Sequence, residues 1–398
     1  MKIESQRARA IDAYLSSHPD AEIGRWPIEI GGEKKVLPFY RFPLDLLFYN
    51  ANNGRLAMDV REWEQNNGRK LDGRQPEDAK IICEMLLCLD PDKTDVLKKD
   101  LHQKGQMEPG VITHDGIVIN GNRRMAVLET LHKDEPTGKW RFLEAVRLSP
   151  TISEQDLWRV EAGLQLSKDK VAEYHPVNEL LKIKEGIDRG LSPEEVAAAM
   201  YAWKANEIKD ALDRLELIDN FLHFLGQPDN YGAIKKFGLH EYFIDIQKRV
   251  IAPAKRKGIR KKHLKKRLQY TFALIRAGIL MQSRGKSKRK GFTHWDIRNL
   301  DRVFSDAHTK SAFVEQLEKT KDMRSVPEEK VIEGFRDAIE ILEMREERNR
   351  PVRLIEKAIN ALESIDTESE HFYCERVKQA TDRLLKLVRS IQKQLAEQ

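Results

Sequence analysis

The sequence predicts an α+β N-terminal domain followed by mainly α-helical domains. Short apolar runs separated by turn residues occur before residue 150, whereas apolar residues recur at helical spacing after residue 151. The composition agrees, because 34% charged and only 7% aromatic residues favour helices with solvated faces over a β-sandwich. We therefore expect one sheet-containing domain, close to the N-terminus.

The 398 residues exceed one ordinary hydrophobic core, and we divide them into five regions. An N-terminal helix and extended arm are expected over residues 1–37, and the α/β domain over residues 38–150. The helical part comprises a helix-turn-helix-like region over residues 151–226, a basic helical module over residues 227–325, and C-terminal amphipathic helices over residues 326–398.

Turn signals define the centre of the first domain. His114-Asp115-Gly116 lies between two short apolar runs and predicts a tight hairpin. Asn120-Gly121 then leads directly into a helix predicted over residues 122–133. The other elements expected here are a helix over residues 6–16, a strand entering a helical turn over residues 39–50, helices over residues 78–89 and 94–104, and a strand over residues 142–148.

Helix start signals recur in the second half. Ser192-Pro193-Glu194-Glu195 predicts a capped helix, because Ser suits the N-cap, Pro the first helical position and Glu the third. The following helix makes residues 192–219 compatible with a helix-turn-helix. Breaks are predicted at Asn349-Arg350-Pro351 and around residues 364–370. The apolar faces of these C-terminal helices suit a homodimer or a partner protein.

Several classes of protein are disfavoured. Cys83 and Cys88 lie within an apolar run and are interpreted as core residues rather than as part of a disulfide scaffold or a metal site. The charged N-terminus has no signal-peptide pattern. The longest apolar stretch, residues 270–281, is too short for a bilayer and contains Arg276. We expect a cytoplasmic protein with no membrane partner and no metal ligands.

The strand-to-helix turn around Gly121 is the strongest candidate site. The first backbone N–H groups of a helix lack internal partners and carry partial positive charge, and Gly121 would let an anion approach them. Arg123 and Arg124 add cations to this helix start, where their sign disfavours helix stability unless an anion is present. On spacing alone, an anion site and two structural ion pairs are about equally favoured.

The segment Gly121-Asn122-Arg123-Arg124-Met125-Ala126 resembles the Gly-x-Arg-Arg box of the ParB/sulfiredoxin superfamily. Two earlier segments are similar to the family's preceding boxes, in the same order. The first consists of residues 42–50 together with Asn53-Gly54-Arg55. The second consists of residues 105–109 together with residues 111–113. The resemblance spans about 110 residues and continues more weakly through Gln165 and the helix-turn-helix-like region.

The resemblance implies DNA binding with CTP hydrolysis, nucleotide-dependent kinase or reductase chemistry, or nuclease activity. Asn122 replaces the cysteine of the reductases, which excludes that chemistry, and Asn50 or Asn52 replaces the kinases' catalytic acid. Of the Glu-Asn-x-Gln-Arg motif of CTP-hydrolysing members only Gln165 remains, with Glu161 one residue out of register. The resemblance thus implies a nucleotide or phosphate site with CTP or ATP and Mg²⁺ as candidate ligands and no assigned catalytic residue. Its residues are Arg55, Gln106, Gly121, Asn122, Arg123, Arg124 and Gln165.

Charge is concentrated in one segment. Residues 248–290 contain 17 Lys or Arg and no Asp or Glu, and the rest of the chain has 53 basic against 64 acidic residues. This density favours non-specific DNA binding over a solvated face or a protein-docking surface. The second helix of the helix-turn-helix-like pair, in contrast, is acidic and a poor DNA reader. The predicted DNA-binding residues are Lys255, Arg256, Lys257, Arg260, Lys261, Lys262, Lys265, Lys266, Arg267, Lys286, Lys288, Arg289 and Lys290.

Together these features favour a DNA-associated ParB-like protein in a mobile-element, partition or defence setting, with a bound nucleotide or phosphate. One alternative is an enzyme of this fold, either a nuclease or a nucleotide-dependent phosphotransferase. Another is a subunit that binds a partner protein and uses the domain as a scaffold.

Overall fold

The computed structural model describes residues 4–136, 138–166, 174–200, 203–284, 292–320 and 322–396. The chain divides into two compact units. Unit 1 comprises Met1–Asp301 with Gln316–Ile332, and unit 2 comprises Arg302–Glu315 with Glu333–Gln398. Among the described residues, no helix has the length and apolarity that a membrane crossing requires.

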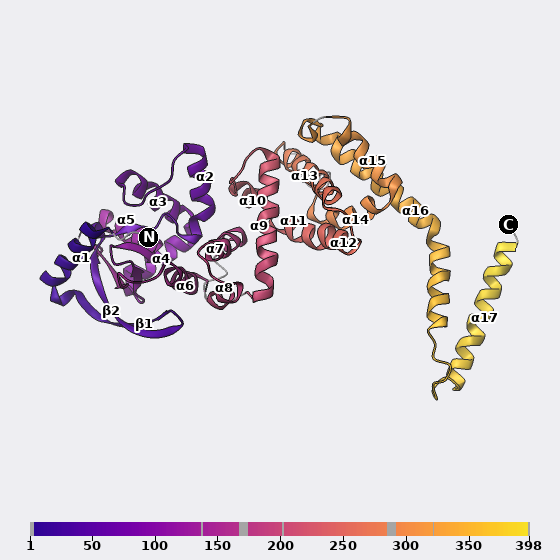
Figure 1. Ribbon diagram of the computed structural model, residues 1–398, viewed down its shortest axis with the longest axis horizontal. Helices are drawn as coiled ribbons and strands as arrows, with labels where there is room; N and C mark the ends of the chain where they lie inside the picture. Colours follow the sequence, from indigo (N-terminus) through magenta and orange to yellow (C-terminus); the bar gives the residue numbers. More distant parts are fainter. Residues whose placement is uncertain are drawn as a thin grey trace. The chain divides into compact units, whose positions relative to one another are not determined.

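Unit 1 begins with a mixed six-stranded sheet, which bears out the α+β expectation for the N-terminal region (Figure 1). The strand order is β1-β2-β6-β4-β5-β3; the β3–β5 and β4–β6 pairs are parallel, and the other pairs are antiparallel. The strands are β1 (Glu22–Ile30), β2 (Glu33–Pro43), β3 (Phe48–Tyr49), β4 (Gly110–Ile112), β5 (Ile117–Asn120) and β6 (Phe142–Arg147).

The segment expected as an extended arm forms β1 and the start of β2, and these two strands make a long hairpin that belongs to the sheet. Ile30 pairs with Glu33, which leaves Gly31-Gly32 as a two-residue turn. Both glycines have positive φ, 64° and 79°, as the tightest hairpin turns require. Strand β2 also pairs with β6, so the hairpin is continuous with the rest of the sheet.

Helices cover the sheet and enclose the first core. Apolar side chains of α3 and α5 pack with those of the strands, including Ile82, Leu128 and Val118, all at most 1% exposed. Cys83 packs against this core, but Cys88 is exposed, contrary to the core interpretation. The helices here are α1 (Ser5–Ser17), α2 (Ala57–Asn67), α3 (Pro76–Cys88), α4 (Pro91–Lys104) and α5 (Asn122–Asp134).

The rest of unit 1 is helical, as predicted. Ser192 caps α8 with the expected capping box: its side chain accepts from the backbone of Glu195, and the Glu195 side chain accepts from the Ser192 backbone. The helices are α6 (Glu154–Gln165), α7 (Pro176–Asp188), α8 (Pro193–Ala199), α9 (Ala205–Leu225), α10 (Gly232–Lys236), α11 (His240–Ile246), α12 (Ala252–Arg256), α13 (Lys261–Ser283) and the first part of α14 (Ile297–Ser305).

Unit 2 contains the C-terminal helices. Its helices are the end of α14, most of α15 (Ala307–Glu318), α16 (Glu328–Glu363) from Glu333 onward, and α17 (Glu375–Ala396). The break predicted at residues 349–351 is absent, because α16 continues through Pro351. This stretch is exposed, so water can satisfy the carbonyl whose helical bond the proline removes. The second predicted break lies between α16 and α17.

Candidate anion-binding site

Gly121 makes the turn from β5 into α5. It is the N-cap of the helix, with φ 108°, a conformation that other L-residues rarely adopt. The Met125 N–H donates to the Gly121 carbonyl at 2.8 Å, which closes the first helical turn. The first N–H groups of α5, like those of any helix, have no acceptor within the helix itself.

Asn122 holds this turn in place. Its side chain is buried, its Nδ2 donates to the Val118 carbonyl at 2.6 Å, and its Oδ1 accepts from the Asn50 N–H at 2.9 Å. The amide therefore joins the end of β5 to the segment after β3. Asn122 lines the site, but both ends of its side chain already bond the protein's own backbone.

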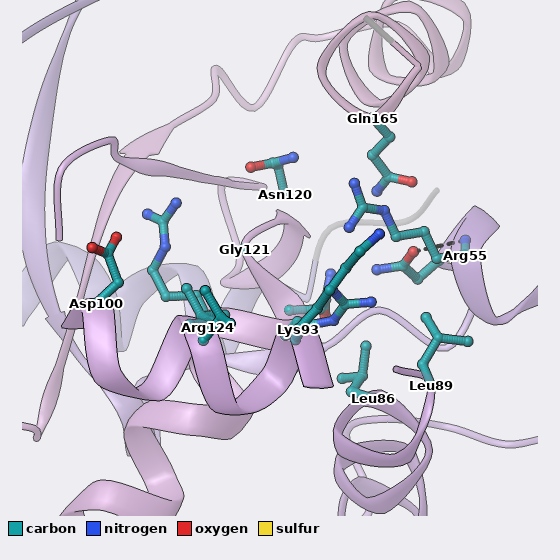
Figure 2. Close-up of a pocket in the computed structure, with 14 residues that line it drawn as sticks. Arg55, Leu86, Leu89, Lys93, Asp100, Asn120, Gly121, Arg124 and Gln165 are labelled. Carbon is teal, nitrogen blue, oxygen red and sulfur yellow. Dashed lines mark hydrogen bonds between the residues drawn. The ribbon is translucent and has the colours of Figure 1, made fainter. Parts of the chain in front are cut away.

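A cavity of about 450 Å³ opens at the start of α5 (Figure 2). Four cationic side chains from three separate elements line it: Arg55 from a 3₁₀ turn, Lys93 from α4, and Arg123 and Arg124 from α5. The single acidic residue in the lining is Asp100. Leu86, Leu89, Val96 and Leu97 add apolar surface from α3, α4 and the short connection between them.

Arg124 lies at one side of the cavity (Figure 2). Its guanidinium donates to the Glu108 carbonyl, and burial lowers its pKa. A lowered pKa means that the charged form is less well solvated than on an open surface. An anion in the cavity would offset that cost.

Arg55 projects from the turn Gly54–Leu56, whose backbone is fixed on both sides. The Arg55 N–H donates to Asn53 Oδ1 at 3.0 Å, and its carbonyl accepts from Asn178 Nδ2 at 2.8 Å. In Figure 2 the Arg55 side chain extends from this turn into the same space as Lys93 and Gln165. The turn thus aims a cation across the cavity toward α5.

A buried ion pair supports the same turn. Glu161 Oε1 accepts from the Gly54 N–H at 3.3 Å, while Glu161 Oε2 lies 2.7 Å from Lys182 Nζ. Burial raises the pKa of Glu161. Burial alone would lower the pKa of Lys182, but Glu161 and Glu185 reverse this, and the net direction is upward. Glu161 therefore positions the Arg55 turn, and Lys182 already holds its other oxygen.

Gln165 and Gln106 differ in their relation to the cavity. Gln165 lines it, although its Oε1 accepts from the Tyr174 hydroxyl at 2.8 Å and its Nε2 donates to the Ile119 carbonyl at 3.3 Å. Gln106 is not in the lining, and its amide bonds the backbone of β6 at Phe142 and Glu144. It holds the segment before β4 against β6, an inner strand of the sheet.

The structure therefore brings six of the seven predicted residues around one cavity: Arg55, Gly121, Asn122, Arg123, Arg124 and Gln165. Sequence reasoning missed Lys93, Asp100 and the apolar surface of the cavity. The sequence around Lys93 has no distinguishing motif, because this lysine reaches the site only through the packing of α4 beside α5.

Most of the predicted DNA-binding residues of the basic module lie at the end of α12, in the turn that follows it and at the start of α13. Eight predicted DNA-binding residues are exposed there: Lys255, Arg256, Lys257, Arg260, Lys261, Lys262, Lys265 and Lys266. Arg267 is instead buried, with NH1 3.6 Å from Asp301 Oδ1, so it is not available to DNA. Two of the exposed lysines have acidic partners, Lys257 with Asp301 at 2.8 Å and Lys266 with Glu318. The predicted residues Lys286, Lys288, Arg289 and Lys290 lie outside the described residues.

The second helix of the helix-turn-helix-like pair is α9. Asp210 and Glu216 are exposed on it. Arg214, one of its few cations, is half-buried and donates to Gln247 Oε1 at 2.8 Å. The exposed surface of this helix is thus no better suited to phosphate than the sequence suggested.

Among the described residues, no group of three or more His, Cys, Asp or Glu side chains is placed to hold a metal ion. No known family model matches the chain, and no curated protein matches it either.

Proposed function

We propose that this protein is a DNA-associated, ParB-like protein that binds a nucleotide or nucleic-acid phosphate in the cavity at Gly121. A second surface, the basic turn between α12 and α13, contacts DNA without reading its sequence. A mobile-element, partition or defence setting remains part of the proposal, and it rests on the family resemblance of the Gly121–Ala126 segment.

One observation carries the phosphate site: four cationic side chains from three elements line one cavity with a single carboxylate. Lys93 also has a carboxylate partner outside the lining, Asp90 at 3.6 Å. Like charges brought together repel, and Arg123 and Arg124 occupy the first turn of a helix, where cations are unfavourable. An anion relieves both effects. Helix N–H groups and arginines together are the donors that phosphate-binding sites commonly use.

The size and lining of the cavity favour a nucleotide over a small inorganic anion. About 450 Å³ lies within the range of small-molecule sites, roughly 300–1,000 Å³. The apolar surface from Leu86, Leu89 and Leu97 offers contact for a base or sugar while the arginines hold the phosphates. A ligand with one charged and one apolar end fits this arrangement.

The geometry favours binding over turnover. Glu161, the nearest substitute for the acidic residue that CTP-hydrolysing relatives use, is paired with Lys182. The enzyme alternative, a nuclease or phosphotransferase, would have to depend on Asp100, the single carboxylate of the cavity lining. Release of phosphate from CTP or ATP, or metal-dependent nicking of a plasmid, would favour that alternative.

Exposed cationic side chains support the proposed DNA-binding surface. Lys255, Arg256, Arg260, Lys261, Lys262 and Lys265 are exposed, and no ion pair to them was found among the described residues. Four of these, including the N-cap Arg260, lie in the first turns of α13, where cations disfavour the helix. DNA phosphate would supply the missing negative charge through counterion release.

The C-terminal helices carry the proposal of a homodimer. Helix α17 has no buried residue, yet Val377, Leu384, Val388 and Ile391 follow the heptad spacing of a coiled-coil seam. A second copy of this helix would cover that stripe. Sedimentation of the full chain, compared with the Leu384→Lys and Val388→Lys variants, tests the dimer.

Calorimetry with a ligand series tests the phosphate site. The series is CTP, ATP, inorganic tripolyphosphate and the nucleoside cytidine, each with and without Mg²⁺. The proposal expects binding of the triphosphates, weaker binding of tripolyphosphate and no binding of cytidine, since phosphate supplies most of the affinity. Cytidine binding as tight as CTP binding would show that the arginines do not recognise phosphate.

A further inference from the structure

A single exposed tryptophan lies close to the basic turn. The chain has six tryptophans, and Trp295 is the only one that is exposed, at 57%. It belongs to a 3₁₀ turn, His294–Asp296, directly before α14. Burying an aromatic side chain of this size is strongly favourable, so a fixed and exposed one is a candidate binding surface.

The turn that carries Trp295 is held from both sides. The Thr293 N–H and hydroxyl donate to Asp296 Oδ2 at 2.7 and 2.8 Å. The His294 ring, which lies 4.6 Å from the Trp295 ring, is anchored with Nδ1 3.4 Å from Asp245 Oδ2 on α11. These contacts therefore fix the backbone at Trp295, so its side chain is exposed from a held turn and not from a loose loop.

Arg298 packs against the Trp295 ring. Its guanidinium carbon lies 4.2 Å from the centre of the Trp295 ring, one helical turn further along the chain. More than half of the tryptophan stays exposed beside it, so ring surface remains for another flat partner. A planar cation and an aromatic ring side by side are the groups on which nucleobases stack.

Asp301 links this pair to the basic turn. It lies one turn after Arg298 on α14, so the two side chains share a face. Its carboxylate holds Lys257 Nζ at 2.8 Å and lies 3.6 Å from Arg267 NH1. Arg298 and Trp295 are therefore connected to the α12–α13 turn through Asp301 and Lys257.

We infer that Trp295 and Arg298 form a stacking platform for an unpaired nucleobase, and that the strand bound at the basic turn is single-stranded. This inference deepens the proposed nucleic-acid contact and rests on it. A single strand presents base faces to an aromatic ring, while the lysines contact its phosphates. A duplex hides its base faces between base pairs and offers only their edges.

Charge argues against an apolar protein partner at this place. Arg298 lies over the Trp295 ring, and Asp301, one turn further along α14, is already paired with Lys257 of the α12–α13 turn. Protein–protein hot spots are instead surrounded by contacts that exclude water around a packed pocket. A guanidinium over an open indole ring, next to a segment with many exposed cations, suits a polyanion with flat bases.

Binding of labelled oligonucleotides by fluorescence anisotropy tests the inference on the full chain. The ligands are oligo(dT), oligo(U) and a mixed-sequence duplex with the same number of phosphates. Trp295→Ala is compared with Trp295→Phe and with Val36→Ala, an exposed apolar residue on β2 that serves as the control. Stacking contributes about 1–3 kcal/mol per base, so Trp295→Ala should weaken single-strand binding roughly 5- to 150-fold. Duplex affinity should not change, and Trp295→Phe should restore part of the loss.

Intrinsic fluorescence gives a second readout. The exposed Trp295 should be quenched when oligo(dT) binds, and Trp295→Phe should remove most of that quenching.

Two failures are distinguishable. If neither single strand nor duplex binds in a salt-dependent way, the proposed nucleic-acid contact is wrong and the platform with it. If both bind but Trp295→Ala leaves the single-strand affinity unchanged, or lowers both affinities equally, only the stacking platform is wrong.

Discussion

Replacing Lys182 by methionine removes the cation of the buried ion pair that supports the Arg55 turn. The Lys182 side chain is fully buried and that of Glu161 is 6% exposed, so the carboxylate would lose its partner in a place that water does not reach. Removing one member of such a pair costs about 3–5 kcal/mol. Glu185, the second carboxylate on Lys182, is 28% exposed and can be hydrated. Stability of a folded domain is about 5–15 kcal/mol, so the loss is a large fraction.

Urea unfolding at pH 7 measures this cost. The matched control is the double variant Glu161→Gln with Lys182→Met, which removes both charges while Gln keeps an acceptor for the Gly54 N–H. We expect the double variant to be more stable than Lys182→Met alone. The single variant should also recover as the pH falls below 7. The folded-state pKa of Glu161 is raised above its unfolded value, so protonation favours the fold until both states are protonated.

Two results would refute this reasoning. One is a loss of less than about 1 kcal/mol in Lys182→Met, the range of an exposed ion pair. The other is a double variant no more stable than the single one, because then the unpaired Glu161 charge is not the source of the cost.

Three further predictions concern the turn, the basic surface and acid stability. Gly121→Ala should lower stability by about 1–3 kcal/mol in urea unfolding, because φ is 108° there, and an unchanged stability would contradict the strained turn. The double variant Lys261→Gln, Lys262→Gln should make the slope of log affinity for duplex DNA against log salt concentration less negative by roughly 0.9 for each lysine. Its stability should not fall, since both lysines lie at the start of α13, where cations are unfavourable. An unchanged slope would exclude both lysines from the phosphate contact. Burial lowers the pKa of His175 and of His240 to about 4. The unfolded chain therefore takes up these protons near pH 6.5 and the folded chain does not, so stability should fall from pH 6.5 to about 4, and less steeply in His240→Gln. Equal pH dependence in that variant and the parent chain would rule out a role for His240.

The features that the sequence predicted correctly are those encoded within a few residues. Ser192 and Glu195 form their capping box, and Gly121 turns directly into α5. The β1–β2 hairpin was missed although Gly31-Gly32 marks its turn. Pro27 lies within β1 and Pro38 within β2, and a proline in a sequence argues against a strand prediction. Proline is tolerated in a strand at an unpaired edge or at a position that makes no hydrogen bond to the next strand.

The candidate site was predictable only in part for the same reason. Arg123 and Arg124 are adjacent to Gly121 in sequence, so a helix start implied their place. Lys93 comes to the cavity through tertiary packing, which has no local signature. Gln106 was predicted from the family resemblance alone, and its amide bonds β6 instead. Arg267 was grouped with its basic neighbours, although its helical position turns it inward toward Asp301.

The central proposal, a phosphate held by the arginines at the Gly121 turn, is tested most directly by calorimetry of one nucleotide with three proteins. These are the parent chain, Arg124→Gln and Arg25→Gln, an exposed arginine on β1 away from the cavity. A hydrogen bond to a charged group contributes about 1.5–3 kcal/mol, so Arg124→Gln should weaken CTP binding by roughly 10- to 150-fold. Arg25→Gln should bind as the parent chain does. Equal affinities in all three proteins, or no binding by the parent chain, would contradict the proposal.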